Sequence, residues 1–272
     1  MGLVSDLLHY TLDGDRTLPI VVFLHGFLGS SEEFDPVVSL LAGRFCCLRI
    51  DLPGHGKTQV AGGEECYAIA PTARAIIRLL DHLAMPPTYL MGYSMGGRLA
   101  LYLALHYDAR FPKVMLESAS PGLKTEAERV ARRHHDFALA QRLETDFAGF
   151  LAEWYEQPLF RSLKQHPQFE TMIQNRLKND PATLATSLRC MGTGMQPSLW
   201  QQLSRHQSPV LGVVGACDRK FITIYQEMAM LCSTLHVAIS PDTGHNVHLE
   251  NPEFMASCIQ SFFCDRDPLI CS

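Results

Sequence analysis

The sequence predicts an α/β fold in which a mostly parallel sheet is flanked by helices and interrupted by a helical insertion. Short apolar runs that end in turn residues indicate the strands, and helical patterns fall between most of them. The alternation stops between residues 121 and 206, which indicates the insertion.

Six runs have the length and β-branched content of buried parallel strands. In chain order they cover residues 19–24, 45–50, 88–91, 113–116, 209–214 and 235–239. Apolar residues recur at helical spacing within residues 72–83, 95–107, 222–231 and 252–263. Strands that alternate with helices predict a parallel sheet with right-handed crossovers.

The segment between residues 121 and 206 contains several helical patterns and no convincing strand. Prolines punctuate it at Pro158, Pro167, Pro181 and Pro197. It is too long for a loop without structure of its own. We therefore expect a helical cap that covers one edge of the sheet. The predicted domains are a first core part at 1–120, a cap at 121–206 and a second core part at 207–272.

The composition excludes several classes of protein. Hydrophobic residues make up 47% of the 272 residues, enough for a real core and against wholesale disorder. The formal net charge of -5 argues against a nucleic-acid binder. No apolar run approaches the roughly 18 residues of a membrane span. The amino terminus carries acids at Asp6, Asp13 and Asp15 rather than a basic region, so we expect no signal peptide.

The nine cysteines are odd in number and form no CxxC pair. A zinc site or a secreted disulfide framework requires a different pattern. Reduced, mostly buried thiols in a cytoplasmic protein are the simplest interpretation. We predict no metal site, no membrane partner and no nucleic-acid partner.

The sharpest motif is Gly-Tyr-Ser-Met-Gly-Gly at residues 92–97, which matches G-x-S-x-G between a predicted strand and a predicted helix. An abrupt strand-to-helix turn exposes the oxygen of Ser94 at the carboxyl end of the sheet. Small residues at Gly92 and Gly96 let the backbone pass close by. A glycine-rich turn without chemistry is the alternative, which the strand and helix context disfavours.

A nucleophilic or basic serine needs a base, and that base needs an orienting acid. Asp218 follows the fifth predicted strand and His245 follows the sixth, so all three side chains can meet at one rim. The order serine, aspartate, histidine is the one this architecture uses. A turn aspartate and a loop histidine are the alternatives when each is taken alone, but the ordered set favours catalysis.

His25-Gly26-Phe27 follows the first predicted strand. Its backbone can bring the amide of Phe27 beside the amide of Met95, which starts a helix. Two such donors form an oxyanion hole, each contributing roughly 2.7–4 kcal/mol to the lowering of a barrier. The alternative is a plain turn at the end of a strand.

Arginines indicate the kind of substrate. Arg98 lies one helical turn beyond Ser94, and Arg132 and Arg176 lie in the predicted cap. Guanidinium groups near a serine favour a substrate with several carboxylates, because arginine binds a carboxylate through two parallel hydrogen bonds. A surface charge is the alternative for each cap arginine, and we expect it for Arg129 and Arg133.

These motifs resemble the α/β-hydrolase superfamily over essentially the whole chain. The resemblance is carried by HGF at 25–27, DLPGHG at 51–56, GYSMGG at 92–97, GACD at 215–218 and GHNVHLENP at 244–252. It implies an α/β-hydrolase fold with a cap and a catalytic triad of Ser94, Asp218 and His245. The fold alone fixes the reaction poorly.

The stretches 117–136, 152–160 and 175–188, together with GYSMGGR, closely resemble the 2-succinyl-6-hydroxy-2,4-cyclohexadiene-1-carboxylate synthase family of menaquinone or phylloquinone biosynthesis. The resemblance implies a lyase that eliminates pyruvate from a small tricarboxylate, with the triad acting as a base and without metal or organic cofactor. It also implies that Arg98, Arg132 and Arg176 bind the carboxylates and that Trp154 and Tyr93 line the pocket. His25 is a further expected substrate-binding residue.

Two other functions remain open at this point. A serine hydrolase could use the same triad on an ester or a C–C bond of a carboxylate-bearing substrate. A non-catalytic receptor could keep the fold to bind a small acid, although an intact triad argues against it. The sequence leaves open the choice between menaquinone and phylloquinone and the oligomeric state, for which a monomer is possible.

Overall fold

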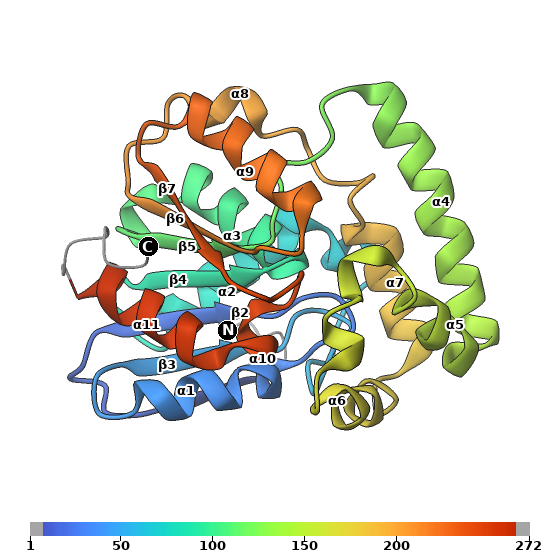
Figure 1. Ribbon diagram of the computed structural model, residues 1–272, viewed down its shortest axis with the longest axis horizontal. Helices are drawn as coiled ribbons and strands as arrows, with labels where there is room; N and C mark the ends of the chain where they lie inside the picture. Colours follow the sequence, from blue (N-terminus) through green and yellow to red (C-terminus); the bar gives the residue numbers. More distant parts are fainter. Residues whose placement is uncertain (1–7, 265–272) are drawn as a thin grey trace.

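The computed structural model describes residues 8–264. Residues 1–7 and 265–272 lie outside the described part, so the expectation about the amino terminus and the outer bounds of the predicted domains fall partly outside it. Seven strands form one sheet in the order β1-β3-β2-β4-β5-β6-β7 (Figure 1). Only β1 (Tyr10–Asp13) runs antiparallel, against β3 (Cys46–Ile50), and all other pairs are parallel.

The predicted strands are confirmed to within a residue or two. Besides β3 they are β2 (Ile20–Leu24), β4 (Tyr89–Tyr93), β5 (Val114–Glu117), β6 (Val210–Gly215) and β7 (Leu235–Ser240). Strand β1 was not predicted. Its four residues are all half-buried, so they lack the continuous apolar run that identifies the inner strands.

Helices cover both faces of the sheet. One face packs against α2 (Ile69–His82), α3 (Met95–His106) and α9 (Arg219–Leu231). The other packs against α1 (Asp35–Leu41) and α11 (Pro252–Phe263). All of these helices except α1 were predicted. The α/β prediction is therefore confirmed.

Strand β2 shows how the two cores form. All five of its residues are buried, and successive side chains point to opposite faces. Val22 and Leu24 join the core under α2 and α3, whereas Val21 and Phe23 join the core under α1 and α11. A strand buried on both faces must be apolar throughout, which is the pattern that identified it.

Helices fill the chain between β5 and β6. They are α4 (Glu126–Thr145), α5 (Phe147–Trp154), α6 (Phe169–Arg176), α7 (Pro181–Met191) and α8 (Trp200–Leu203), with 3₁₀ turns η5 (Pro158–Phe160) and η6 (Leu163–Gln165). Helix α4 begins with a capping box in which Thr125 and Glu128 bond each other's backbone amides. Residues of α4, α5 and α7 form a separate apolar cluster. We keep the division into a core and a cap as a proposal.

The expectation that the insertion covers an edge of the sheet was wrong. Helices α4 to α7 gather at one end of the sheet, where residues that follow β4, β5 and β6 share a cavity with them (Figure 1). The reason is the topology: β5 and β6 pair with each other inside the sheet, so an insertion between them leaves and re-enters near their carboxyl ends.

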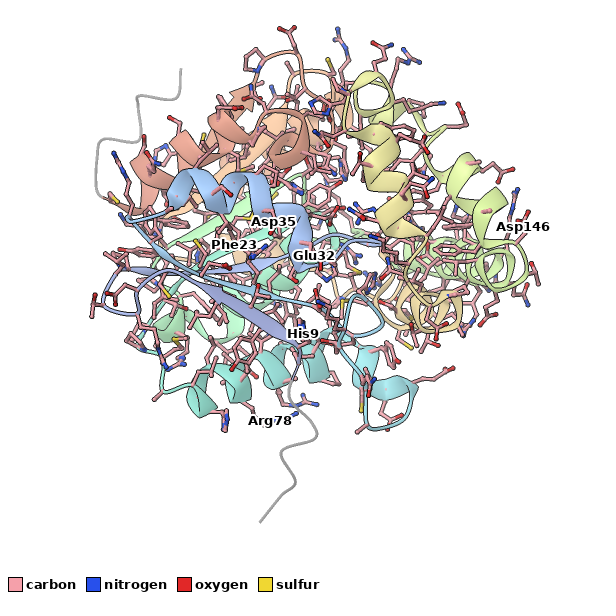
Figure 2. The ribbon with its side chains drawn as sticks, turned by 90° about the horizontal axis from the view of Figure 1, so that it is seen from below. His9, Phe23, Glu32, Asp35, Arg78 and Asp146 are labelled. Carbon is pink, nitrogen blue, oxygen red and sulfur yellow. The ribbon has the colours of Figure 1, made fainter. Side chains whose placement is uncertain are left out.

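A view turned by 90° places Asp146, between α4 and α5, at the outer end of the insertion and Arg78 of α2 on the outer surface of the core (Figure 2). Both side chains are exposed, so the charged residues of these helices face away from the apolar clusters. Among residues 8–264, none of the helices combines the length and the apolar character that a membrane crossing requires.

Candidate active site

Ser94 occupies a strained turn between β4 and α3. Its φ of 49° and ψ of -106° lie where L residues rarely occur, so the surrounding backbone has to hold it there. The Ser94 amide donates to the carbonyl oxygen of Glu117 at 2.8 Å, and the Gly96 amide donates to that of His25 at 3.1 Å. These bonds tie the turn to β5 and to the end of β2.

Glycine is required on both sides of the serine because there is no room for a methyl group. A Cβ at Gly92 would collide with the carbonyl of Gly96, and a Cβ at Gly96 would collide with the carbonyl oxygens of Leu24 and His25. The G-x-S-x-G pattern therefore reflects the close passage of three backbone segments around Ser94.

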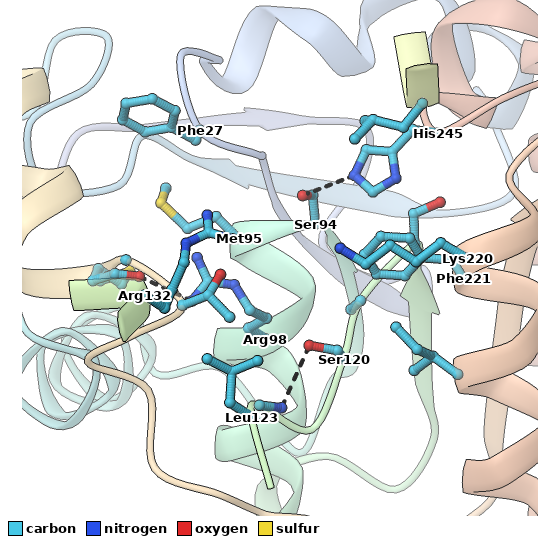
Figure 3. Close-up of a pocket in the computed structure, with 18 of the residues that line it drawn as sticks. Phe27, Ser94, Met95, Arg98, Ser120, Leu123, Arg132, Lys220, Phe221 and His245 are labelled. Atoms are coloured by element: carbon cyan, nitrogen blue, oxygen red, sulfur yellow. Dashed lines mark hydrogen bonds between the residues drawn. The ribbon is translucent and has the colours of Figure 1, made fainter. Parts of the chain in front are cut away.

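The three residues of the predicted triad lie within hydrogen-bonding distance of one another. The Oγ of Ser94 is 3.1 Å from Nε2 of His245, and Nδ1 of His245 is 2.7 Å from Oδ2 of Asp218. Asp218 and His245 are buried, whereas Ser94 is partly exposed. Figure 3 shows Ser94 and His245 joined by their hydrogen bond. This geometry allows the imidazole to take the serine proton while the carboxylate holds the ring in one tautomer.

Asp218 has a second structural role. Its Oδ1 accepts a hydrogen bond from the Phe221 amide at 3.3 Å, which makes it the N-cap of α9. One carboxylate therefore orients His245 and fixes where α9 begins. The ring of Phe221 packs 4.6 Å from that of His245.

A second buried pair lies behind the triad. The carboxylate of Glu117 accepts from the amide and from Nδ1 of His248 at 2.8–3.0 Å, and neither side chain is exposed to solvent. His248 belongs to α10 (Val247–Glu250), which directly follows the loop of His245. Since the carbonyl of Glu117 also accepts from the Ser94 amide, this residue links the serine turn to the histidine loop.

Phe27 and Met95 line the same cavity as Ser94. Met95 is the first residue of α3, so its amide has no partner four residues back in that helix. The bond from Gly96 to His25 brings the start of α3 against the segment that carries Phe27. These positions suit the predicted oxyanion hole.

The cavity beside Ser94 has a volume of about 380 Å³, within the range of small-molecule sites. Its wall comes from both the sheet side and the insertion (Figure 3). Four cationic side chains take part in it: Arg98, Lys124, Arg132 and Lys220. The two carboxylates in the lining, Glu128 and Glu227, leave an excess of positive charge.

Arg98 is buried beneath this cavity. Its Nη1 donates to the carbonyl of Met191 at 2.9 Å and to the side chain of Gln196 at 3.3 Å. Burial, and then the charge of Arg132, lower the pKa of Arg98 to about 10. Among residues 8–264, no carboxylate pairs with this guanidinium directly, so an anionic ligand would relieve an unfavourable buried charge.

Arg132 and Trp154 form the part of the wall that comes from the insertion. The Nε of Arg132 donates to Oδ1 of buried Asp136 at 2.7 Å, which orients the guanidinium. The indole of Trp154 packs edge-on against Phe27 with ring centroids 5.4 Å apart. Both residues line the cavity beside Ser94.

The structure does not bring the other three predicted binding residues to this cavity. His25 is fully buried, with both ring nitrogens bonded to backbone groups of Gly26 and Leu52. Tyr93 points toward His248 and the core under α11. Arg176 is buried in an ion pair with Glu33, and its Nε donates to the hydroxyl of Tyr155 at 3.2 Å.

The sequence interpretation missed Lys124, Lys220 and Phe221. Lys124 pairs with Glu227 at 2.6 Å and lies over the ring of Trp200. Lys220 and Phe221 line the cavity beside His245. Lys220 and Phe221 follow Asp218 within three residues, so their closeness to the triad could have been inferred. Which of their side chains face the cavity depends on where α9 begins, and the sequence does not show that position.

Two buried histidines near the end of β2 are held neutral by their hydrogen bonds. In His55, Nε2 accepts from the Leu28 amide at 3.1 Å while Nδ1 lies 3.1 Å from the carbonyl of Pro53. Each nitrogen thus has a fixed role as acceptor or donor, which only the neutral ring can fill. Burial lowers the pKa of His55 well below 6.5.

Acid should therefore destabilise the fold through His55. An unfolded histidine takes up a proton near pH 6.5, whereas the folded one resists it, so stability falls as the pH drops below 6.5. We expect this residue to account for a loss of about 1.4 kcal/mol in total between pH 7.5 and pH 5.5, most of it below pH 6.5. Urea unfolding at pH 7.5, 6.5 and 5.5 should show that loss in the wild type and a smaller one in His55→Gln.

Exposed His134 provides the control, since His134→Gln should keep the wild-type pH dependence. An equal loss of stability in His55→Gln and in the wild type would contradict the assignment of this effect to His55.

Comparison with known proteins places this geometry in context. Residues 19–252 match the family described as alpha/beta hydrolase fold. A Serratia proteamaculans (strain 568) protein named 2-succinyl-6-hydroxy-2,4-cyclohexadiene-1-carboxylate synthase is 34% identical over 251 residues, covering 92% of this chain and 94% of that protein. A Bacillus subtilis (strain 168) protein, provisionally given the same name, is 36% identical over 264 residues, covering 95% and 96%.

A solved structure shows the same arrangement. The structure of MenH from S. aureus is similar with a TM-score of 0.89 and 33% sequence identity, covering 95% of this chain and 98% of that chain. The similarity therefore includes the inserted helices as well as the sheet.

Proposed function

The chain belongs to the α/β-hydrolase fold family and, within it, to the 2-succinyl-6-hydroxy-2,4-cyclohexadiene-1-carboxylate synthases, and on this basis we propose that it is the lyase of that reaction. It would eliminate pyruvate from 2-succinyl-5-enolpyruvyl-6-hydroxy-3-cyclohexene-1-carboxylate. We also propose that it does so in the cytoplasm, as a step toward menaquinone or phylloquinone.

One observation supports this proposal most directly: the Ser94–His245–Asp218 chain opens onto a cavity with four cationic side chains in its wall. A pocket for neutral esters has no use for that charge. A substrate with three carboxylates does, because each charge-assisted hydrogen bond contributes about 1.5–3 kcal/mol before desolvation and ordering costs.

The triad would work as a base. His245 takes the proton of Ser94, and Asp218 stabilises the imidazolium that forms. The Ser94 oxygen then removes the ring proton α to the succinyl ketone. The electron pair of that C–H bond forms the carbon–carbon bond of an enolate, whose oxygen is stabilised by the amides of Phe27 and Met95.

Elimination completes the reaction. As the ketone re-forms, the ring double bond shifts and the bond from the ring to the enolpyruvyl oxygen breaks. That oxygen leaves with the electron pair, so pyruvate is released as its enolate. The proton held by His245 then protonates this enolate, and His245 returns to its neutral form. A cyclohexadiene remains on the ring, and no covalent bond to Ser94 forms at any step.

Release of pyruvate by the purified protein tests this function. We expect stoichiometric pyruvate and loss of the enolpyruvyl substrate, measured with a coupled lactate dehydrogenase assay and by absorbance. A serine hydrolase with the same triad would instead show a burst of acyl-enzyme with p-nitrophenyl esters. Turnover of such an ester that far exceeds pyruvate release would overturn the lyase proposal.

A further inference from the structure

Lys220 differs from the other cations that line the cavity. Arg132 forms an ion pair with Asp136, and Lys124 forms one with Glu227. Arg98 donates a hydrogen bond to the carbonyl oxygen of Met191. Among the described residues, by contrast, no carboxylate pairs with Lys220, and its ammonium group only lies 5.6 Å from the ring centroid of Phe221. Its charge is therefore available to a ligand.

Lys220 also lies at a different end of the cavity. Figure 3 shows its side chain extending across Phe221 toward the middle of the cavity, on the side of Ser94 and His245. Arg98 and Arg132 lie on the opposite side. The cavity thus carries positive charge at both ends, with the serine between them.

Lys220 stands in the first turn of α9. Helix α9 has 13 residues, and its first turn contains Arg219 and Lys220 but no acidic residue. Cations are unfavourable at a helix N-terminus, because the unsatisfied amides already carry partial positive charge there. The negative charge at this helix start is that of the N-cap Asp218, and its carboxylate bonds the Phe221 amide and His245 rather than Lys220.

We propose that Lys220 binds a carboxylate of the substrate at the reacting end of the cavity. The proposal rests on the lyase function above and identifies a further residue that determines which substrate is bound. Three carboxylates are present in that substrate: on the enolpyruvyl group, on the succinyl chain and on the ring. In each case the contact would be an ion pair between the Lys220 ammonium group and a carboxylate. The experiment distinguishes which of the three carboxylates takes part.

The test compares Lys220→Met, Lys220→Arg and the wild type. Methionine keeps the length of the side chain and removes the charge. We expect Lys220→Met to raise KM about tenfold, equivalent to about 1.4 kcal/mol, while kcat changes much less. Lys220→Arg should restore most of the loss, since it keeps the charge at the same place.

Arg219→Met is the matched control, because it removes a neighbouring exposed cation that does not line the cavity. It should change KM less than twofold. An equal effect of Arg219→Met and Lys220→Met would show that only the general field at the start of α9 matters, and would overturn the proposal. An unchanged KM in Lys220→Met would also overturn it.

Inhibition by pyruvate, succinate and cyclohexanecarboxylate identifies the bound group. The inhibitor whose Ki rises in Lys220→Met, but not in Arg219→Met, marks the carboxylate that Lys220 holds. If the wild type binds these acids but releases no pyruvate, the lyase function is wrong. The Ki values of the three acids still test whether Lys220 binds a carboxylate. If none of the three constants responds to Lys220→Met, the carboxylate site is wrong even where pyruvate release is confirmed.

Discussion

Ser94→Ala should reduce pyruvate release by about 10⁴-fold, the upper range for loss of general acid–base catalysis. The variant keeps His245 and Asp218, but no oxygen remains between the imidazole and the ring proton. The carboxylate contacts do not involve the serine, so the Kd for the substrate should stay within about threefold of the wild-type KM. Calorimetric titration of the variant measures this binding without turnover.

Ser120→Ala is the control for this prediction. Ser120 lines the same cavity, but within the described part of the chain its hydroxyl accepts only a 3.4 Å hydrogen bond from the Gly122 amide and does not bond the histidine. It should retain most of the wild-type rate. A Ser94→Ala protein that keeps more than a tenth of the activity would exclude a role for Ser94 as the base.

Gly96→Ala should cause the largest loss of stability. Position 96 lies in the first turn of α3, where alanine has a better helix propensity than glycine by roughly 1 kcal/mol. The added methyl group nevertheless collides with the carbonyl oxygens of Leu24 and His25, and both belong to rigid backbone at the end of β2. Overpacking of this kind costs about 3 kcal/mol or more, so the collision outweighs the propensity.

Thermal and urea unfolding would measure this loss. For a chain of this size, about 3 kcal/mol corresponds to a fall in Tm of roughly 6 °C or more. The comparison variant is Gly43→Ala, where φ is +74° and a Cβ would meet nothing within 4 Å. Only backbone strain acts there, so its cost should be near 1 kcal/mol. Equal stability of the two variants would refute the steric explanation of the motif.

The sheet and the serine, histidine and aspartate could be predicted because both depend on local pattern. Buried parallel strands are apolar throughout, and residues after their carboxyl ends must converge on one rim. Strand β1 and helix α1 lacked such a pattern. Strand β1 is only half-buried and is defined by its pairing with β3, which the sequence does not display.

The binding residues were harder to predict because side-chain direction and distant charges decide them. Tyr93 ends β4 on the same face as Met91, so strand alternation turns it toward α11 and away from the cavity. Arg176 is separated from Glu33 by more than a hundred residues, and only the fold reveals that their charges meet. Lys220 was missed because its direction depends on Asp218 as the cap of α9.

Glu117 also bears on how the inserted helices can vary. It stands just before the insertion, and its contacts to Ser94 and His248 join the chain that precedes the insertion to the chain that follows it. The insertion also holds the reacting groups, because the His245 amide donates to the carbonyl oxygen of Leu159 in η5 at 3.3 Å. Helices α4, α6 and α7 can therefore change in shape only if the η5 turn keeps its place, because that turn supports the loop of the catalytic histidine from above.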